Sequence, residues 1–315
     1  MRKILVKLKR LLTYGIENKI DKLSVVTGQI AASSVCKAEK IESLSDAGFS
    51  IYSQFDEDGI IEWLIQRLPI SSNRFIEFGV ENYIESNTRF LLKNRNWKGL
   101  IMDSSPSYID YIHKDNIYWR HDLTAICAFV TPDNINELLE GANFKGKIGI
   151  LSIDAGGMDY WIWKAMNVVD PDIVICEYNA VFGDLHAIVV PYQNNFESRE
   201  AHYSGLYWGA STRAFELLAL EKGYVLLGSN IGGHNLFFLR KELCSYVDQY
   251  MSDKRSKPSL YRDSRSPEGK LTYTGGVKRY EMIKHLSVYN IETKKNTLLE
   301  TLSPIYSENW LEKIK

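Results

Sequence analysis

A single glycine stands between two carboxylates at the end of an apolar run, residues 74–80, in the first third of the sequence. Glu77, Gly79 and Glu81 occupy this point. A pyrophosphate cradle needs several glycines and no nearby anions, so this segment does not suit a dinucleotide. S-adenosylmethionine is cationic at its sulfonium and α-ammonium groups, and neighbouring carboxylates suit it. We expect Gly79 to let the backbone pass close to this cofactor and Glu77 to bind its ammonium group; the alternative is that Glu77 caps the next helix.

Two further acids end the next predicted strands. Asp103 ends the run at 99–103, where an acid can hydrogen-bond both ribose hydroxyls of a cofactor. Asp122 ends the run at 116–122 and is predicted to meet the adenine amino group; a helix N-cap or a solvated turn is its alternative role. Ligands bind at the carboxyl ends of strands in open α/β sheets, so both residues are expected at one site.

Oxygen-bearing side chains also end the fourth and fifth predicted strands. Asp154, Glu177 and Asn179 form an all-oxygen set suited to Mg2+. Alternatively, the carboxylate of Asp154 removes the proton of an acceptor hydroxyl, as oxygen methyl transfer requires. A third interpretation is that Asp154 and Asp159 cap the following helix.

One histidine lies in a long irregular stretch that follows the fifth strand. We predict His202 as the general base because histidine titrates near neutrality; a surface or structural role is the alternative. The stretch itself, residues 179–209, is long for a loop inside a compact domain, and such loops are usually functional. We expect it to determine which acceptor is bound.

Short β-rich runs alternate with helical segments from residue 73 onward, which is typical of a mostly parallel sheet covered by helices on both faces. The predicted parallel strands are 74–80, 99–103, 116–122, 147–154 and 172–178. The predicted helices are 86–93, 108–113, 133–139, 160–166 and 211–221. Two further strands, 224–230 and 235–241, share a tight glycine turn and must be antiparallel. The sequence therefore predicts an α/β fold with a seven-stranded sheet closed by a terminal hairpin.

The predicted main domain, residues 51–247, is flanked by two segments of different character. Residues 1–50 are predicted to form a helical extension, and residues 248–315 a polar linker and C-terminal tail. Near the start, apolar residues share one helical face and cations the other; the apolar ones are Ile4, Leu5, Leu8, Leu11 and Leu12. This face is compatible with an anionic membrane surface, with the chain's own domain, or with a second subunit in a homo-oligomer.

The composition excludes several classes of protein. The net charge of −1 argues against a nucleic-acid binder, which needs a basic surplus. The four cysteines form no CxxC pair, so neither a disulfide framework nor a zinc site is indicated. The N-terminal apolar run is interrupted too early to span a membrane. We therefore expect a cytoplasmic protein that contacts a membrane at most peripherally.

An ordered set of motifs over roughly residues 50–245 closely resembles the bacterial FkbM-like S-adenosylmethionine methyltransferases. The motifs are YSQFDEDGIIEWLI, FIEFGVENYIESNTRFLL, WKGLIMD, LSIDAGGMDYWIWKAM, DIVICEYNAVFG, YWGASTRAFELLALEKGY and GGHNLFFLRKEL. The resemblance implies a Rossmann-like class I methyltransferase fold and, since relatives occur among genes for surface-polysaccharide assembly, a sugar-derived acceptor. It implies two sets of site residues: cofactor contacts at Glu77, Gly79 and Asp103, and acceptor-side or metal-side residues at Asp154, Glu177 and Asn179.

The sequence departs from this family at one position. Relatives read acid-x-acid-Gly-x-Asp after the fourth strand, whereas here Gly156 replaces the second acid. The leading hypothesis is an O-methyltransferase that acts on a small-molecule, sugar-nucleotide or glycan acceptor. Gly156 supports an alternative, a methyltransferase fold that binds without turnover. A nicotinamide-dependent sugar dehydrogenase or epimerase is a further alternative, but the sequence lacks a glycine-rich phosphate loop.

Overall fold

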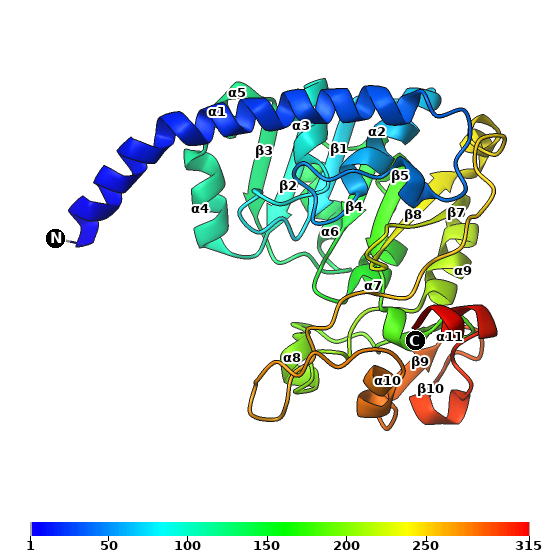
Figure 1. Ribbon diagram of the computed structural model, residues 1–315. Coiled ribbons are helices and arrows are strands. Elements are labelled where there is room, and N and C mark those ends of the chain that lie inside the picture. Colours follow the sequence, from blue (N-terminus) through cyan, green and yellow to red (C-terminus); the bar gives the residue numbers. More distant parts are fainter. Residues whose placement is uncertain (1, 315) are drawn as a thin grey trace.

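The computed structural model describes the backbone of residues 2–314 and the side chains of residues 15–314 except residue 17. Seven strands form one sheet in the order β3-β2-β1-β4-β5-β8-β7 (Figure 1). The strands are β1 (Arg74–Phe78), β2 (Lys98–Asp103), β3 (Leu123–Cys127), β4 (Gly146–Ile153), β5 (Val169–Glu177), β7 (Tyr224–Ser229) and β8 (Asn235–Arg240). The first five are parallel, and β8 is antiparallel to both β5 and β7. The predicted mostly parallel sheet with a terminal hairpin is confirmed.

Helices cover both faces of the sheet, which explains why its strands are almost continuously apolar. One face carries α1 (Arg2–Cys36), α2 (Glu57–Arg67), α3 (Arg89–Arg95), α4 (Pro106–Lys114) and α5 (Asn116–Arg120). The other carries α6 (Ile135–Gly141), α7 (Asp159–Ala165) and α9 (Thr212–Lys222). The ends of α9 follow capping rules: the Ser211 side chain accepts a hydrogen bond from the N–H of Ala214, and Gly223 ends the helix at φ +85°.

The prediction that residues 116–122 form the third strand is wrong. Residues 116–120 form α5, because the Asp115 side chain accepts a hydrogen bond from the N–H of Ile117 and so caps a helix at this point. The third strand is the next apolar run, Leu123–Cys127. Asp122 therefore precedes a strand instead of ending one.

A second, smaller sheet lies beneath the carboxyl ends of the parallel strands (Figure 1). Its strands are β6 (Ile188–Val189), β9 (Ser287–Asn290) and β10 (Lys295–Leu298). The short elements around it are η2 (Ala180–Phe182), α8 (Ser198–Ala201), α10 (Lys278–Ile283), η4 (Leu299–Leu302) and α11 (Glu308–Ile314). Two other 3-10 helices, η1 (Leu44–Ala47) and η3 (Lys241–Tyr246), flank the main sheet. The segment predicted as a C-terminal tail thus contributes a strand partner to the 180–190 segment, with Trp310 buried in the same core as β5.

The N-terminal extension contains one long helix, α1, which crosses α2 and α3 (Figure 1). The predicted apolar face formed by Ile4 to Leu12 falls on side chains outside the described residues. In the described part of the chain, no helix is both long enough and apolar enough to span a lipid bilayer.

Candidate active site

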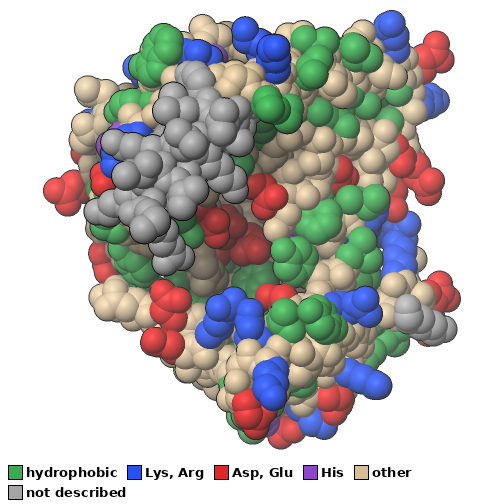
Figure 2. All heavy atoms as spheres, turned by 60° about the vertical axis from the view of Figure 1, so that its left-hand side comes forward, with side chains coloured by type: hydrophobic (Ala, Val, Ile, Leu, Met, Phe, Trp, Pro, Cys, Tyr) green, Lys and Arg blue, Asp and Glu red, His purple; other side chains and the backbone are tan. Residues whose placement is uncertain are grey.

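Two cavities meet at the carboxyl ends of the parallel strands. One has a volume of about 190 Å³ and the other about 280 Å³. Asp154, Gly156 and Ser198 line both, so the cavities adjoin. Figure 2 shows a hollow on one face of the molecule with acidic side chains inside it. Adjoining cavities at this edge of the sheet suit a reaction between two bound molecules.

The smaller cavity is lined by the residues at which four neighbouring strands end. Gly79 follows β1, Asp103 ends β2, and Ala155 follows β4. Residues 128–130, which follow β3, line the same space, and Phe129 is 44% exposed. A half-exposed aromatic ring offers a surface on which a flat base can stack. We call this space the cofactor cavity.

Position 79 requires glycine because the loop after β1 approaches the end of β4 closely there. Its φ is +70°, and a Cβ atom added there would lie 1.8 Å from the carbonyl oxygen of Asp154. No L side chain fits that space, so only glycine allows the loop after β1 to rest against the end of β4. The predicted close approach is therefore made to Asp154 of the protein itself, at the wall of the cofactor cavity.

Asp103 lies at the mouth of the cofactor cavity and is held by two backbone groups. Its Oδ2 accepts a hydrogen bond of 2.8 Å from the N–H of Glu81, and its Oδ1 accepts one of 2.8 Å from the N–H of Ser105. Each carboxylate oxygen has a second lone pair, so both remain able to accept from a ribose hydroxyl. The structure thus places Asp103 where the sequence predicted it.

The carboxylate of Glu77 turns away from the cofactor cavity. Its Oε1 accepts a hydrogen bond from the N–H of Asn87, and its Oε2 accepts from the hydroxyls of Ser86 and Thr88. Burial raises the pKa of Glu77, while these donors favour its charged form. This is the helix-capping alternative, because residues 86–88 lead directly into α3. Glu77 does not line the cavity in the described structure, and neither does the side chain of Glu81.

Asp122 lies at the amino ends of the parallel strands, whereas the cavities lie at their carboxyl ends. It precedes β3, and its carboxylate is 3.3 Å from the ammonium group of Lys98, which begins β2. The predicted contact with an adenine amino group is therefore wrong, because it depended on a third strand at residues 116–122, and residues 116–120 form α5 instead. Ala128 to Val130 occupy the position that the sequence analysis assigned to Asp122. The cap formed by Asp115 was the signal that distinguishes the two apolar runs.

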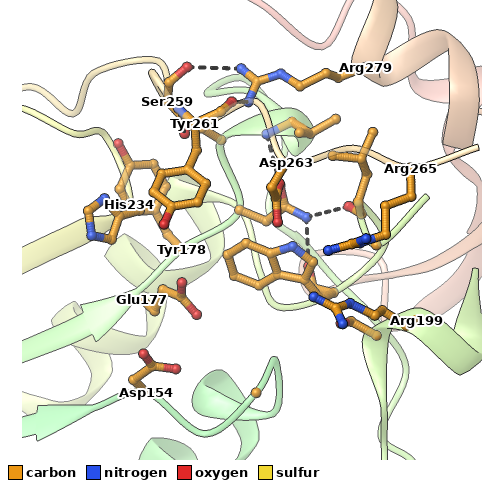
Figure 3. Close-up of a pocket in the computed structure, with 18 of the residues that line it drawn as sticks. Asp154, Glu177, Tyr178, Arg199, His234, Ser259, Tyr261, Asp263, Arg265 and Arg279 are labelled. Carbon is orange, nitrogen blue, oxygen red and sulfur yellow. Dashed lines mark hydrogen bonds between the residues drawn. The ribbon is translucent and has the colours of Figure 1, made fainter. Parts of the chain in front are cut away.

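The larger cavity, which we call the acceptor cavity, has an acidic floor. Asp154 after β4 and Glu177 at the end of β5 lie next to each other there (Figure 3). Asp154 is open to the cavities, although protein encloses it on its other sides. This enclosure raises the pKa of Asp154 to about 6, and the pKa of Glu177 is raised further by burial and by the charge of Asp154. The hydrogen bond between the two carboxyls favours the ionised form of Asp154 and the protonated form of Glu177.

The predicted three-oxygen metal set is not formed. The Oδ1 atom of Asn179 accepts from the N–H of Val181, and its Nδ2 atom donates to the carbonyls of Leu206 and Trp208. Asn179 is 1% exposed. Its amide is fully used in fixing the wall of the acceptor cavity, so it does not serve as a metal ligand, and this prediction is wrong.

Asp159 takes the third position beside Asp154 and Glu177, with carboxylate oxygens of all three within 4.8 Å of one another. Both oxygens of Asp159 already accept backbone N–H groups, from Ala155 and Gly157. Burial raises the pKa of Asp159 to about 7. Asp159 therefore holds the loop after β4; it does not cap α7, whose N-cap is Met158. Asp159 is 0% exposed, whereas Asp154 and Glu177 line the acceptor cavity, so these two are the members of the group within reach of a ligand there. The binding of Mg2+ stays a prediction.

His202 lies outside both cavities as the structure describes them. It ends the short helix α8, its Nδ1 is 2.7 Å from the hydroxyl of Ser204, and its ring packs on Tyr203. The histidine that lines the acceptor cavity is His234, in the turn between β7 and β8. Burial lowers the pKa of His234, and its ring packs against Phe55.

The strand order, with an antiparallel hairpin after five parallel strands, defines a Rossmann-like class I methyltransferase fold and confirms the predicted fold class. No family model matches the chain, and no curated protein matches it.

Several solved structures are similar to this chain at low identity. One is an S-adenosylmethionine-dependent methyltransferase from Clostridium acetobutylicum, with 11% identity over 58% of this chain and 89% of that chain and a TM-score of 0.35. Another is an O-methyltransferase from Bacillus cereus in complex with SAH, with 12% identity, 69% and 89% coverage and a TM-score of 0.37. A third is precorrin-6y C5,15-methyltransferase from Geobacter metallireducens, with 12% identity, 61% and 90% coverage and a TM-score of 0.33. Similarity this low identifies neither a reaction nor a substrate, and the fold assignment rests on the strand order.

Proposed function

We propose that this protein is an S-adenosylmethionine-dependent O-methyltransferase whose acceptor is a sugar or a sugar-linked group. The observation that carries the proposal is the junction of two cavities at Asp154, which lines both. The cofactor cavity offers Asp103 to ribose hydroxyls and Phe129 to a base. The resemblance to FkbM-like methyltransferases supports a sugar-derived acceptor, and this resemblance stays a prediction.

Bound S-adenosylmethionine supplies a methyl group to the acceptor oxygen and leaves as S-adenosylhomocysteine. The chain's own contribution is to place the acceptor hydroxyl in line and to remove its proton. Asp154 is the base in this proposal, since its pKa of about 6 leaves it ionised at neutral pH yet close enough to accept a proton. The Glu177 carboxyl, which hydrogen-bonds to Asp154, orients the Asp154 carboxylate.

The first experiment is a calorimetric titration of the protein with S-adenosylmethionine and, separately, with NADH. We expect micromolar binding of S-adenosylmethionine and none of NADH, because the loop after β1 contains one glycine and no phosphate cradle. Methyl transfer to sugars and nucleotide sugars is then screened. A folded protein that does not bind S-adenosylmethionine would overturn the proposal, and tight NADH binding would revive the dehydrogenase hypothesis.

A second candidate, a binding protein without turnover, is favoured by one observation at Gly156. This residue lines both cavities, and a Cβ added there meets no atom within 4 Å, so the acid of the relatives is replaced by empty space. Asp tolerates the φ of +63° at this position. Gly156→Asp therefore fits, whereas Gly157→Asp, the control, would place its Cβ 2.9 Å from the side chain of Trp208.

The two variants separate the candidates. If the natural protein is an enzyme, we expect its turnover and that of Gly156→Asp to agree within about tenfold. Turnover that is absent in the natural protein and present in Gly156→Asp would establish a degenerate enzyme. Gly157→Asp is expected to lose cofactor binding because the loop is distorted. It shows how far an added carboxylate that clashes with its surroundings lowers binding.

A further inference from the structure

Three arginines line the acceptor cavity away from its acidic floor. Arg199 comes from α8, Arg265 from the long segment that follows η3, and Arg279 from α10. Figure 3 shows the guanidinium groups of Arg199 and Arg265 on one side of the cavity and Asp154 and Glu177 on the other side. Segments distant in sequence thus bring three positive charges to one space.

These arginines lack a partner of opposite charge, whereas five of the nine other arginines with described side chains have one. Within the described residues, none of the three has a carboxylate oxygen within 4.0 Å, although Asp263 lines the same cavity. By contrast, Arg213 pairs with Glu216 and Arg255 with Asp253. Unpaired guanidinium groups facing one cavity are typical of an anion-binding site.

Arg279 is the most buried of the three arginines and is only 5% exposed. It donates hydrogen bonds of 3.0 and 2.8 Å to the carbonyls of Ser259 and Tyr261, while its buried Nε has no partner in the described structure. A buried guanidinium with no counter-ion is costly unless a ligand supplies one. Arg279 thus holds the wall of the cavity in place and adds positive charge to it.

We propose that the acceptor is a phosphorylated sugar whose phosphate binds to Arg199 and Arg265 beside Arg279, with its hydroxyl at Asp154. This proposal rests on the proposed function and names the substrate class. Three guanidinium charges suit a phosphate or diphosphate better than a single carboxylate, and arginine matches phosphate oxygens in bidentate geometry. The acidic floor repels phosphate, which fixes the direction in which the substrate enters.

The test compares glucose 1-phosphate, glucuronate and methyl glucoside as probes in calorimetric titrations. We expect glucose 1-phosphate to bind at least about tenfold more tightly than methyl glucoside, because hydrogen bonds between charged groups stabilise a complex more than neutral ones. The double variant Arg199→Gln, Arg265→Gln should lose most of this difference. Both side chains are at least partly exposed, so folding is expected to survive. The double variant Arg213→Gln, Arg255→Gln removes the same number of positive charges outside both cavities and should bind as the natural protein does.

Equal binding of the phosphate and the neutral sugar would overturn the proposal, as would tighter binding of glucuronate or an unchanged double variant. S-adenosylmethionine is titrated into the same preparation. Its binding without a preference for phosphate contradicts only this inference. A preference for phosphate without binding of S-adenosylmethionine supports the anion site and contradicts the proposed methyltransferase function.

A second inference comes from the exposed face of α1. Five apolar side chains recur at helical spacing and are between 51% and 68% exposed: Ile16, Ile20, Leu23, Val26 and Ile30. The opposite face packs on the domain, where Gly28 lies against the ring of Phe90 and Ala32 is 4% exposed. An apolar stripe pointing away from the core needs another surface to cover it.

The charges of α1 indicate which surface this is. The helix sequence contains seven Lys or Arg and two Asp or Glu residues. One of the acids, Asp21, already pairs internally with Lys93 at 2.5 Å. Pairing with a second copy would bring two cationic helices together, whereas an anionic lipid surface complements both the charge and the stripe.

We infer that α1 lies on an anionic membrane surface with the stripe Ile16–Ile30 toward the lipid. The test is cosedimentation of the full chain with vesicles of phosphatidylcholine alone or with roughly one third phosphatidylglycerol. We expect binding only to the anionic vesicles, weakened by salt. Leu23→Gln with Ile30→Gln should weaken binding about tenfold or more. Leu220→Gln with Leu298→Gln removes exposed apolar side chains elsewhere and should have no effect.

Sedimentation equilibrium of the same samples decides between a membrane and a second copy. A dimer that the α1 variant dissociates, with no vesicle binding, would overturn the inference. So would equal binding of the variant and the natural chain to anionic vesicles. The variant positions are mostly exposed, so retained helical circular dichroism is expected in each case.

Discussion

The two adjoining cavities are built in different ways. The cofactor cavity is lined chiefly by residues at which β1, β2, β3 and β4 end, and the hydrogen bonds of the sheet fix their relative positions. The acceptor cavity also includes parts of the chain from residue 54 to residue 279, most of them outside regular strands. The comparison teaches that the fold itself creates the cofactor side, whereas irregular chain and its anchoring side chains create the acceptor side.

The largest expected effect is at the residue that belongs to both sides. Asp154→Asn keeps the shape but removes the base, and we expect turnover to fall by roughly 10² to 10⁴-fold. Affinity for S-adenosylmethionine should change little, as calorimetry will measure. Asp263→Asn, which changes another acid of the acceptor cavity, should cost far less turnover. Equal losses in the two variants would show that Asp154 contributes only charge to the cavity.

The next largest effect is expected in the cofactor cavity, which a substitution of Gly79 should distort. Gly79→Ala places a Cβ 1.8 Å from the Asp154 carbonyl, so β1 and β4 must separate at their ends. We expect a loss of about 3 kcal/mol in the free energy of unfolding and a clear loss of cofactor affinity, since overpacked sites cost 1–3 kcal/mol or more. Thermal unfolding and calorimetry measure the two. Gly141→Ala, where an added Cβ meets nothing, should be nearly neutral.

The pH dependence of turnover tests whether Asp154, at the junction of the two cavities, is the base. Burial raises the pKa of Asp154 to about 6, and a base acts only when ionised, so the rate should fall about tenfold per pH unit below that value. Initial rates between mildly acidic and neutral pH measure this limb. Glu177→Gln keeps a donor to Asp154 and should leave the limb near the same pH. A limb that persists in Asp154→Asn would assign it to another group.

The smallest expected effect is that of metal removal. The Asn179 amide is held by backbone groups and Asp159 is 0% exposed, so Asp154 and Glu177 are the carboxylates on the floor of the acceptor cavity. We expect turnover to be unchanged after treatment with EDTA, measured with and without added Mg2+. A loss that Mg2+ restores would mean that the loop held by Asp159 rearranges to complete a metal site.

The sheet could be predicted from the sequence because its strands are apolar runs separated by helices, and six of seven were placed within a few residues. The exception, residues 116–122, shows the limit of this pattern. Tyr118 and Trp119 suit a strand as well as a helix, and the capping by Asp115 decided the outcome locally.

The residues of the candidate site also fall into two groups, those at strand ends and those in irregular segments. Gly79 and Asp103 were placed correctly because strand ends determine their positions. His202 and Asn179 were misjudged because side-chain direction in an irregular segment depends on partners such as Ser204 and the Leu206 carbonyl. No periodicity in the sequence reports those partners, and the same holds for the arginines of the acceptor cavity.

The pairing of β6 with β9 joins residues about one hundred positions apart. The parallel strands and the residues of the cofactor cavity leave the ribosome well before α10, which carries Arg279, and before β9. Domains fold from the N-terminal side during synthesis, so the acceptor cavity is completed only when these late elements arrive. A nascent chain released early would therefore contain the cofactor cavity but only part of the acceptor cavity.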